Sequence, residues 1–324
     1  MLFSDSQSNI VLRWRLLLGA IIISLVCLLS WLDLYLEKQT SITGIGLLPL
    51  LIGLLIPSCA ELITLSRLAK ARPQRYVVFL CTLLVVIISW IAPIPIVLGW
   101  AESASTPRML FLLQHANCGS WAFAALGLSL ILVFIIELCR FKNPGVSLIH
   151  VAATMFIIVY LGGLSVFLIL IRAFGGLGYL VTFLLTVKMG DTGAYIIGRL
   201  FGRTKMVPTL SPGKTVEGAV GALVFSCLTS WVMFNLILPI WPKSFTPLPG
   251  LTAGIPYGWL IFGVLIGFIG MIGDLAESML KRAAQRKDSS RWMPGFGGVL
   301  DIMDSILLAA PVAYALWAFG IIAP

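Results

Sequence analysis

Apolar runs of roughly 20 residues recur along the whole chain, separated by short segments rich in charged residues, glycine or proline. Each run is long enough to cross the ~30 Å hydrocarbon core of a bilayer as a helix. Pro93 and Pro95 lie late in the third run, so its helix is expected to end near Ile91. The runs lie near residues 16–36, 43–65, 76–100, 120–139, 149–171, 178–200, 216–240, 256–276 and 299–322. The pattern predicts an all-α, polytopic integral membrane protein with about nine transmembrane helices.

Composition agrees with this fold class, because 59% of the residues are hydrophobic and only 11% are charged. Soluble domains carry roughly 25% charged residues. The sequence therefore leaves no room for a soluble domain of ordinary size, and we predict a single membrane domain over residues 1–324. Residues 1–172 are expected to form N-terminal helices that face lipid or another subunit, and residues 178–322 to form the helices that carry the chemistry. The oligomeric state stays open, and a homodimer is compatible with the sequence.

The basic residues alternate between loops in a way that predicts topology. Seventeen of the 22 Lys and Arg residues fall in one set of alternate loops, and Lys188 lies within a run. The opposite loops hold four, namely Lys38, Arg108, Arg172 and Lys243. Since basic loops stay on the cytoplasmic side, the N-terminus is expected there, in a cell inner membrane. The net charge of +9 then reports topology and anionic lipid, and no nucleic-acid partner is expected.

Polar residues concentrate after residue 187, inside or beside the last four runs. Charged residues within membrane spans are costly and usually functional. The first group is Lys188, Asp191, Lys214, Thr215 and Glu217. The second group is Asp274, Glu277, Ser278, Lys281, Arg282, Asp301 and Asp304. The predicted topology brings both groups to the cytoplasmic half of the membrane.

The spacing of the late acids is typical of a cation site. Asp274 with Glu277, and Asp301 with Asp304, are three residues apart, so each pair shares a helix face. Two carboxylate pairs on neighbouring helices can hold hard cations such as Mg²⁺ through oxygen ligands. An ion pair between Glu277 and Lys281, four residues apart, is the alternative role for Glu277.

Two helix starts add a candidate phosphate site. Ser211 is expected to cap the seventh span with Pro212 at its first position, and Gly297 and Gly298 precede the ninth span. Free N–H groups at such helix starts favour phosphate groups. Basic residues beside metal-binding acids suit a nucleotide polyphosphate together with an anionic lipid.

These polar segments resemble those of the phosphatidate cytidylyltransferase family, also called CDP-diacylglycerol synthases. The matching C-terminal positions are Ser278, Lys281, Arg282, Lys287, Asp288, Pro294, Gly295, Gly297, Gly298, Asp301 and Asp304. Asp191-Thr-Gly-Ala-Tyr195 and the segment from Ser211 to Gly218 match as well, so the resemblance covers about residues 187–305. Phe296 stands where the family usually has His, and Ile302 where it usually has Arg.

The resemblance implies an enzyme in which the phosphate of phosphatidate attacks the α-phosphorus of CTP and pyrophosphate leaves. It implies Mg²⁺ bound by Asp274 and Asp301, with Asp304 supporting, and leaves room for a second metal or a monovalent cation. Phosphate contacts would come from Ser278, Lys281 and Arg282. The nucleotide side would be shaped by Lys214, Thr215 and Glu217, and Asp191 would reach the metal or orient Lys188.

Two other functions stay open at this point. The replacements at Phe296 and Ile302 leave room for another lipid acceptor, such as a different phospholipid or a lipid alcohol phosphorylated by CTP. Acids within glycine-rich membrane helices also occur in ion-coupled transporters. Transporters often show inverted repeats, however, and none is evident here.

Overall fold

The computed structural model describes residues 2–40, 42–91, 107–141, 145–240, 255–290 and 297–322. Side chains are described for these ranges except residues 2–18, 22, 23 and 107–118. Pro294, Gly295 and Phe296, three positions of the family resemblance, lie outside the described residues.

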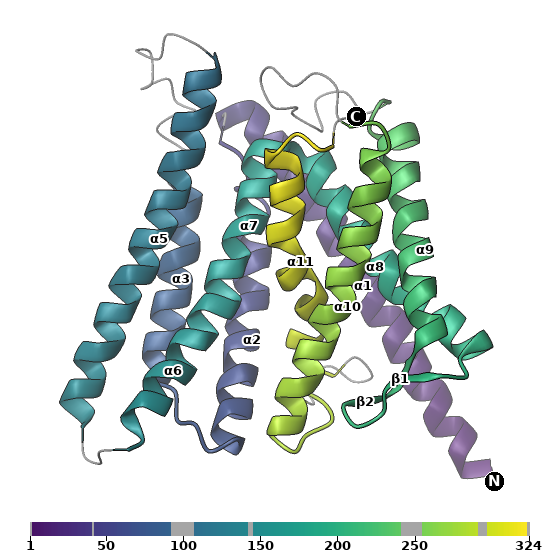
Figure 1. The fold of residues 1–324 in the computed structure, drawn as a ribbon, viewed down its shortest axis with the longest axis horizontal. Helices are drawn as coiled ribbons and strands as arrows, with labels where there is room; N and C mark the ends of the chain where they lie inside the picture. The colour runs from purple at the N-terminus through teal and green to yellow at the C-terminus, as the bar shows by residue number, and fades with distance from the viewer. Residues whose placement is uncertain are drawn as a thin grey trace.

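The described chain is a bundle of long helices that run roughly along one common direction (Figure 1). The α-helices are α1 (Leu2–Thr40), α2 (Leu48–Leu68), α3 (Arg75–Ile91), α5 (Pro107–Arg140), α6 (Ser147–Ile157), α7 (Leu164–Leu170), α8 (Gly176–Phe201), α9 (Val216–Val232), α10 (Gly258–Ala283) and α11 (Leu300–Ala318). Short π-helical segments are η1 (Ile158–Gly163), η2 (Ile171–Gly175) and η3 (Met233–Ile237). The prediction of an all-α membrane fold is confirmed.

Each of the nine apolar runs coincides with helix in the described residues. Seven stretches are long and apolar enough to cross a membrane, and one of them, Ser147–Phe201, contains two of the predicted runs. That stretch turns at Gly176, whose φ of 84° and ψ of 171° interrupt the helix. The third run forms the shorter apolar helix α3, which is helical as far as Ile91, the last described residue before the gap at 92–106. The end of this helix stays a prediction. The number of membrane crossings and the side of the N-terminus stay predictions.

Helix α11 lies in the middle of the bundle, between α7 and α10 (Figure 1). Its side chains take part in two apolar clusters: Ala309, Ala310 and Ala313 pack with α8 and α10, whereas Leu300 and Leu307 pack with α2, α3 and η1. All five are fully buried. Helix α11 is therefore packed on two sides, and this packing fixes the positions of its polar side chains.

Small residues bring α8, α9 and α10 into close contact. A methyl group added at Gly193 would meet the Gly221 carbonyl of α9 at 2.6 Å, and one at Gly267 would meet Ser226 Oγ at 2.7 Å. Gly190 also faces Ser226 from α8. Small residues that let helix backbones approach are the usual means of packing in a membrane, where lipid is as apolar as a leucine side chain.

One antiparallel hairpin interrupts the helices of the described chain. It consists of β1 (Lys205–Val207) and β2 (Ser211–Thr215), with Lys205 opposite Thr215 and Val207 opposite Ser211. The expectation that Ser211 and Pro212 start the seventh span is therefore wrong. The helix begins five residues later, at Val216, because the Ser211–Thr215 segment pairs with a neighbouring strand instead.

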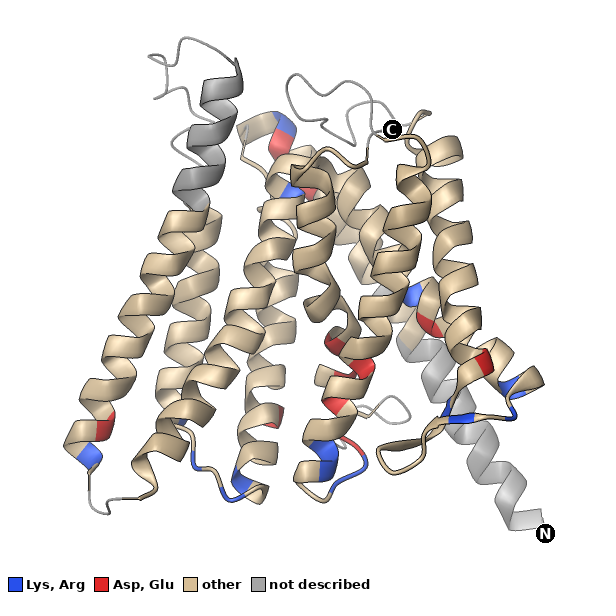
Figure 2. Cartoon of the chain, in the orientation of Figure 1, with Lys and Arg blue, Asp and Glu red and all other residues tan. Residues whose placement is uncertain are grey.

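Charged residues are unevenly distributed over the two ends of the bundle (Figure 2). We call the basic end the one where α2 and α10 finish and α3 and α9 start; it carries Arg67, Arg72, Arg75, Lys214 and Arg282. At the other end, Arg172 is not the loop residue that the topology count assumed. It lies buried in η2, where its guanidinium donates to Asp33 at 2.7 Å and Glu37 at 2.6 Å, which ties α1 to the bundle.

Replacing Arg172 by Met should destabilise the protein strongly, because it leaves the fully buried Asp33 carboxylate unpaired. Removing one partner of a buried pair costs about 3–5 kcal/mol. The thermal midpoint of the purified protein in detergent measures this. Lys38→Met is the matched control, since Lys38 is an exposed cation in the same helix as Asp33. Equal midpoints for the two variants would contradict the assigned role of the Arg172 pair.

Candidate active site

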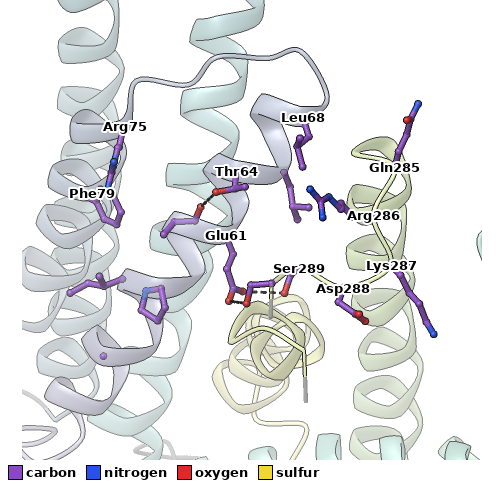
Figure 3. A pocket seen from close by; sticks show the side chains of 16 residues that line it. Glu61, Thr64, Leu68, Arg75, Phe79, Gln285, Arg286, Lys287, Asp288 and Ser289 are labelled. Carbon is purple, nitrogen blue, oxygen red and sulfur yellow. Dashed lines mark hydrogen bonds between the residues drawn. The ribbon is translucent and has the colours of Figure 1, made fainter. Parts of the chain in front are cut away.

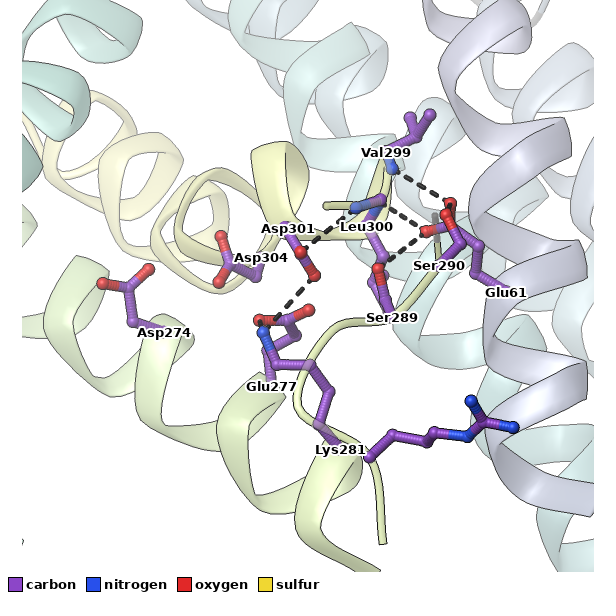
Figure 4. Close-up of polar contacts among 12 residues, drawn as sticks. Glu61, Asp274, Glu277, Lys281, Ser289, Ser290, Val299, Leu300, Asp301 and Asp304 are labelled. Carbon is purple, nitrogen blue, oxygen red and sulfur yellow. Dashed lines mark hydrogen bonds and ion pairs between the residues drawn. The ribbon is translucent and has the colours of Figure 1, made fainter. Parts of the chain in front are cut away.

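The site begins with a contact between the backbones of α10 and α11. A methyl group added at Gly273 would meet the Asp304 carbonyl and Ser305 Cα, both at 2.7 Å. Only a glycine allows this approach. Asp274, the next residue, thereby comes to face Asp304 across the helix pair, closely enough for the two carboxylates to interact electrostatically (Figure 4).

Four carboxylates form a row along this helix contact, which we call the acid row: Asp274 and Glu277 from α10, and Asp301 and Asp304 from α11 (Figure 4). The two pairs share helix faces, as their spacing predicts. Asp274 is the most open of the four, with 31% of its side chain exposed, whereas Glu277 and Asp304 are buried. One Glu277 oxygen, Oε1, has no hydrogen-bond partner among the described residues.

Lysines from two elements neutralise part of the acid row. Lys281 Nζ lies 2.6 Å from Glu277 Oε2 and 3.4 Å from Asp301 Oδ1, so it joins α10 to α11. Lys214, on the β-hairpin, reaches Asp274 Oδ2 at 3.3 Å. The ion pair between Glu277 and Lys281 that the sequence left open is therefore present, and it lies inside the acid row rather than apart from it.

Helix α8 adds a second polar group beside α11. Lys188 Nζ lies 3.0 Å from Asp191 Oδ2 and 3.1 Å from Ser305 Oγ, and Ser305 Oγ lies 3.3 Å from the same Asp191 oxygen. Asp191 thus orients Lys188. Ser305 follows Asp304 directly, so this triad adjoins the Asp274 end of the acid row.

The N-terminus of α11 is closed by an acid from a distant helix. Glu61 of α2 accepts hydrogen bonds from the Val299 and Leu300 amides, at 3.1 and 2.9 Å, and from the Ser289 and Ser290 hydroxyls, at 3.1 and 2.7 Å. The Gly298 amide donates to Asp301. The expectation that free N–H groups here bind phosphate is therefore wrong, because carboxylates already occupy them. A side chain at Gly298 would collide with Glu61 and Ser289.

The start of α9 is occupied in the same way. Thr215 is the N-cap residue, and its buried hydroxyl accepts from the Gly218 amide at 3.1 Å. Glu217 accepts from the Arg203 and Thr204 amides, both at 3.1 Å, and so fastens the chain that leads into the hairpin. These two residues position Lys214; neither lies in the acid row itself.

Two other residues singled out from the sequence lie at the margin of the site. Arg282 donates from Nε to the Leu210 carbonyl at 3.1 Å, so it holds the hairpin turn against α10 and has no ion pair with the acid row. Ser278 is half-buried in α10 beside Glu277. The structure thus gathers Lys188, Asp191, Lys214 and Lys281 around the four acids, while Arg282, Thr215 and Glu217 support the hairpin.

Sequence reasoning missed two residues from the N-terminal half. Glu61 lies within the apolar run 43–65, and an acid buried in a span is itself a functional signal. Tyr160, in the π-helical turn η1, is 7% exposed, and its hydroxyl has no partner among the described residues. The charges of Asp304, Glu277 and Asp274 act on that hydroxyl. No sequence signal distinguishes Tyr160 from the other apolar-run aromatics.

The acid row suits a metal ion that shares its coordination with substrate. Among the described residues, no three His, Cys, Asp or Glu side chains converge into a complete cage. Mg²⁺ does not require one, because it usually takes one or two carboxylates and completes its shell with water and phosphate oxygens. The facing carboxylates of Asp274 and Asp304, with Asp301 one turn away, fit that mode of binding.

Comparison with known proteins shows which family this chain belongs to. The model of the cytidylyltransferase family matches residues 13–319, nearly the whole chain. The chain belongs to the cytidylyltransferase family. Its sequence is similar to curated proteins named phosphatidate cytidylyltransferase, among them relatives from Staphylococcus saprophyticus, Haemophilus influenzae and Chlamydia muridarum. The relative from Staphylococcus saprophyticus is 40% identical over 144 residues, which is 42% of this chain and 48% of the relative.

The other two relatives give the same picture. The relative from Haemophilus influenzae is 37% identical over 138 residues (42% of this chain, 44% of the relative). The relative from Chlamydia muridarum is 35% identical over 143 residues (44% of each). The matched part of this chain therefore spans about half the length of the curated relatives.

Replacing Glu61 by Leu should loosen the start of α11, because four donors lose their acceptor. Leaving buried donors unsatisfied costs about 1–3 kcal/mol each. Hydrogen–deuterium exchange should therefore quicken at the Val299 and Leu300 amides. Thr64→Val, one turn along α2, is the control, since the Thr64 hydroxyl donates only to its own helix at Ala60. Unchanged exchange in the Glu61 variant would show that the cap does not hold α11.

Proposed function

We propose that this protein transfers the cytidylyl group of CTP to phosphatidate, giving CDP-diacylglycerol and pyrophosphate. Membership of the cytidylyltransferase family supports this, as do the names of the curated relatives. The single structural observation that carries the proposal is the acid row with its lysines, at one depth near the basic end of the bundle.

The chemistry requires little covalent help from the protein. A phosphate oxygen of phosphatidate forms a bond to the α-phosphorus of CTP, while the bond from that phosphorus to the pyrophosphate oxygen breaks. The nucleophile is already an anion, so no general base is needed. Catalysis is then positioning of two anions and neutralisation of the charge that moves to the leaving group.

The lysines are well placed for that neutralisation. Lys188 and Lys214 flank the Asp274 end of the acid row, and Lys281 lies within it. In a low-dielectric site each of these charges acts far more strongly than in water. We assign the triphosphate to the Asp274 end, where the hairpin lysine and the α8 lysine approach from separate elements.

Mg²⁺ is the cofactor of this proposal, held by Asp274 of α10 together with Asp301 and Asp304 of α11. When bound, it supplies positive charge to the triphosphate oxygens. Lys214 and Lys281 contact Asp274 and Asp301, and a bound cation would share these carboxylate oxygens with the two lysines. A second metal or a monovalent ion belongs to the same proposal.

The location of the site follows from the distribution of charge. The basic end of the bundle corresponds to the loops that the positive-inside rule assigns to the cytoplasm. CTP is a cytoplasmic metabolite, so we propose an active site that opens to the cytoplasm from an inner membrane. The acids gather toward one end rather than at the midplane, which favours an enzyme over an ion-coupled transporter.

The test is turnover by the purified protein in mixed micelles. Pyrophosphate release should require CTP, Mg²⁺ and phosphatidate together, and mass spectrometry should detect CDP-diacylglycerol. Replacing phosphatidate by a lipid alcohol or by another phospholipid tests the acceptor. Product from one of these lipids but none from phosphatidate would overturn the assigned acceptor, and no CTP consumption with any lipid would overturn the enzyme class.

A variant links turnover to the acid row. Asp274→Asn should lower kcat by about 10²-fold or more, which is typical of losing one charge-stabilising group in an active site. Glu137→Gln is the matched control, because Glu137 is a buried acid of α5 paired with His150 and Gln74, outside the acid row. A kcat equal to wild type for Asp274→Asn would exclude Asp274 from the reaction.

A further inference from the structure

A long groove separates α2 and α3 from the segment that follows α10 (Figure 3). Its volume is about 960 Å³. One wall is a single stripe of α2, and two residues of α3, Arg75 and Phe79, contribute to the lining. The α2 stripe consists of Gly53, Ile56, Pro57, Ala60, Glu61, Thr64, Leu65 and Leu68. Apart from Glu61, Ser289 and Ser290, its lining has no role in the site described so far.

The groove has the dimensions of a lipid chain. From Gly53 to Leu68 the stripe measures about 22 Å along the helix axis. One leaflet contributes only about 15 Å of hydrocarbon, half of the bilayer core. The space beside Gly53 is open, since no atom lies within 4 Å of an added methyl group. The groove is therefore long enough to hold an acyl chain that crosses one leaflet.

The lining of the groove combines apolar and basic residues. Ile56, Pro57 and Ala60 of α2 are apolar, whereas Arg75, Arg286 and Lys287 add three basic side chains. None of these three cations has an ion pair with a described residue. We call them the basic rim.

The groove has fewer acids than cations, with Glu61 and Asp288 against the three residues of the basic rim. Glu61 is buried and accepts four hydrogen bonds from the start of α11 and the segment before it. Asp288 is then the one remaining acid among the lining residues. A lipid with an anionic headgroup and an apolar tail matches this combination of basic and apolar lining residues, whereas a neutral lipid leaves the basic rim without a partner.

The polar end of the groove adjoins the acid row from the side opposite the triphosphate. Glu61 and Ser289 line the groove and also bond to each other. Glu61 caps α11 directly before Asp301, and in Figure 4 Glu61 and Asp274 lie at opposite ends of the polar assembly. A headgroup in the groove thus approaches the acid row from the α2 side, away from Lys188 and Lys214.

We infer that this groove is the entry and binding site for the phosphatidate acceptor, with an acyl chain along α2 and the phosphate at the basic rim. The inference rests on the proposed function, and it assigns the N-terminal helices a part in substrate recognition. The two anionic substrates then reach the acid row from different sides, so neither must pass the other.

The first test blocks the groove. Ala60→Trp places a large side chain in its apolar part and should raise the KM for phosphatidate in mixed micelles by about tenfold or more, with the KM for CTP unchanged. Ala124→Trp, on an exposed face of α5, is the matched control and should behave as wild type. An unchanged phosphatidate KM for Ala60→Trp would overturn the inference.

The second test removes the basic rim. Each basic group near a membrane surface contributes roughly fivefold to binding of an anionic lipid. The double variant Arg286→Gln with Lys287→Gln should therefore raise the phosphatidate KM by more than tenfold while kcat changes little. Arg67→Gln with Arg72→Gln is the control, because those arginines line a separate hollow with Arg140. Equal effects of the two double variants would show that the basic rim acts only through the overall surface charge, and this result would overturn the assignment.

A binding measurement separates this inference from the proposed function. Phosphatidate with a photoreactive acyl chain, added without CTP, should label α2 near Ile56 and Ala60 in wild type, and less in Ala60→Trp. Equal labelling by a photoreactive phosphatidylcholine would overturn the inference, because the groove would then not select an anionic headgroup. A disulfide between two subunits of the Ala60→Cys variant would also overturn it, because a second copy of the chain would then cover the groove. If wild type binds phosphatidate here yet never consumes CTP, the proposed function fails and the groove assignment survives.

Discussion

Charged groups inside a membrane domain must find partners, and that constraint organises this structure. Asp274, Glu277 and Asp301 each contact a lysine, and those lysines come from α10 and the hairpin. Lys188 and Asp191 satisfy each other on α8. The pairing holds three of the four acids of the acid row in place. A phosphate that binds here can therefore replace a carboxylate as the partner of a lysine, and a cation can replace a lysine as the partner of a carboxylate.

The N-terminal helices are part of this arrangement and not merely a lipid-facing shell. Glu61 reaches from α2 to the start of α11, and Leu300 and Leu307 pack against α2 and η1. The first half of the chain thus helps to fix the position of Asp301 and Asp304 through the contacts of α2 and η1 with α11. A description of the chain as two separable parts, one structural and one chemical, misses this coupling.

The sequence predicts features that depend on local spacing. Apolar runs located the helices, and the three-residue spacing placed Asp301 and Asp304 on one face. Features that depend on distant partners were not predictable in the same way. Glu61 caps an amide 239 positions away, and Arg172 pairs with Asp33 across 139 positions. Ser211 and Pro212 have the pattern of a helix start, but pairing with Lys205–Val207 makes them a strand.

The central claim is that carboxylates of α10 and α11 together hold a divalent cation against a nucleotide triphosphate. Electron paramagnetic resonance of Mn²⁺ bound to the purified protein, with a non-hydrolysable CTP analogue present, tests it most directly. The account predicts bound Mn²⁺ in wild type and its loss in Asp274→Asn and in Asp304→Asn, with Glu137→Gln unaffected. Mn²⁺ binding that stays at the wild-type level in the double variant Asp274→Asn with Asp304→Asn would contradict it.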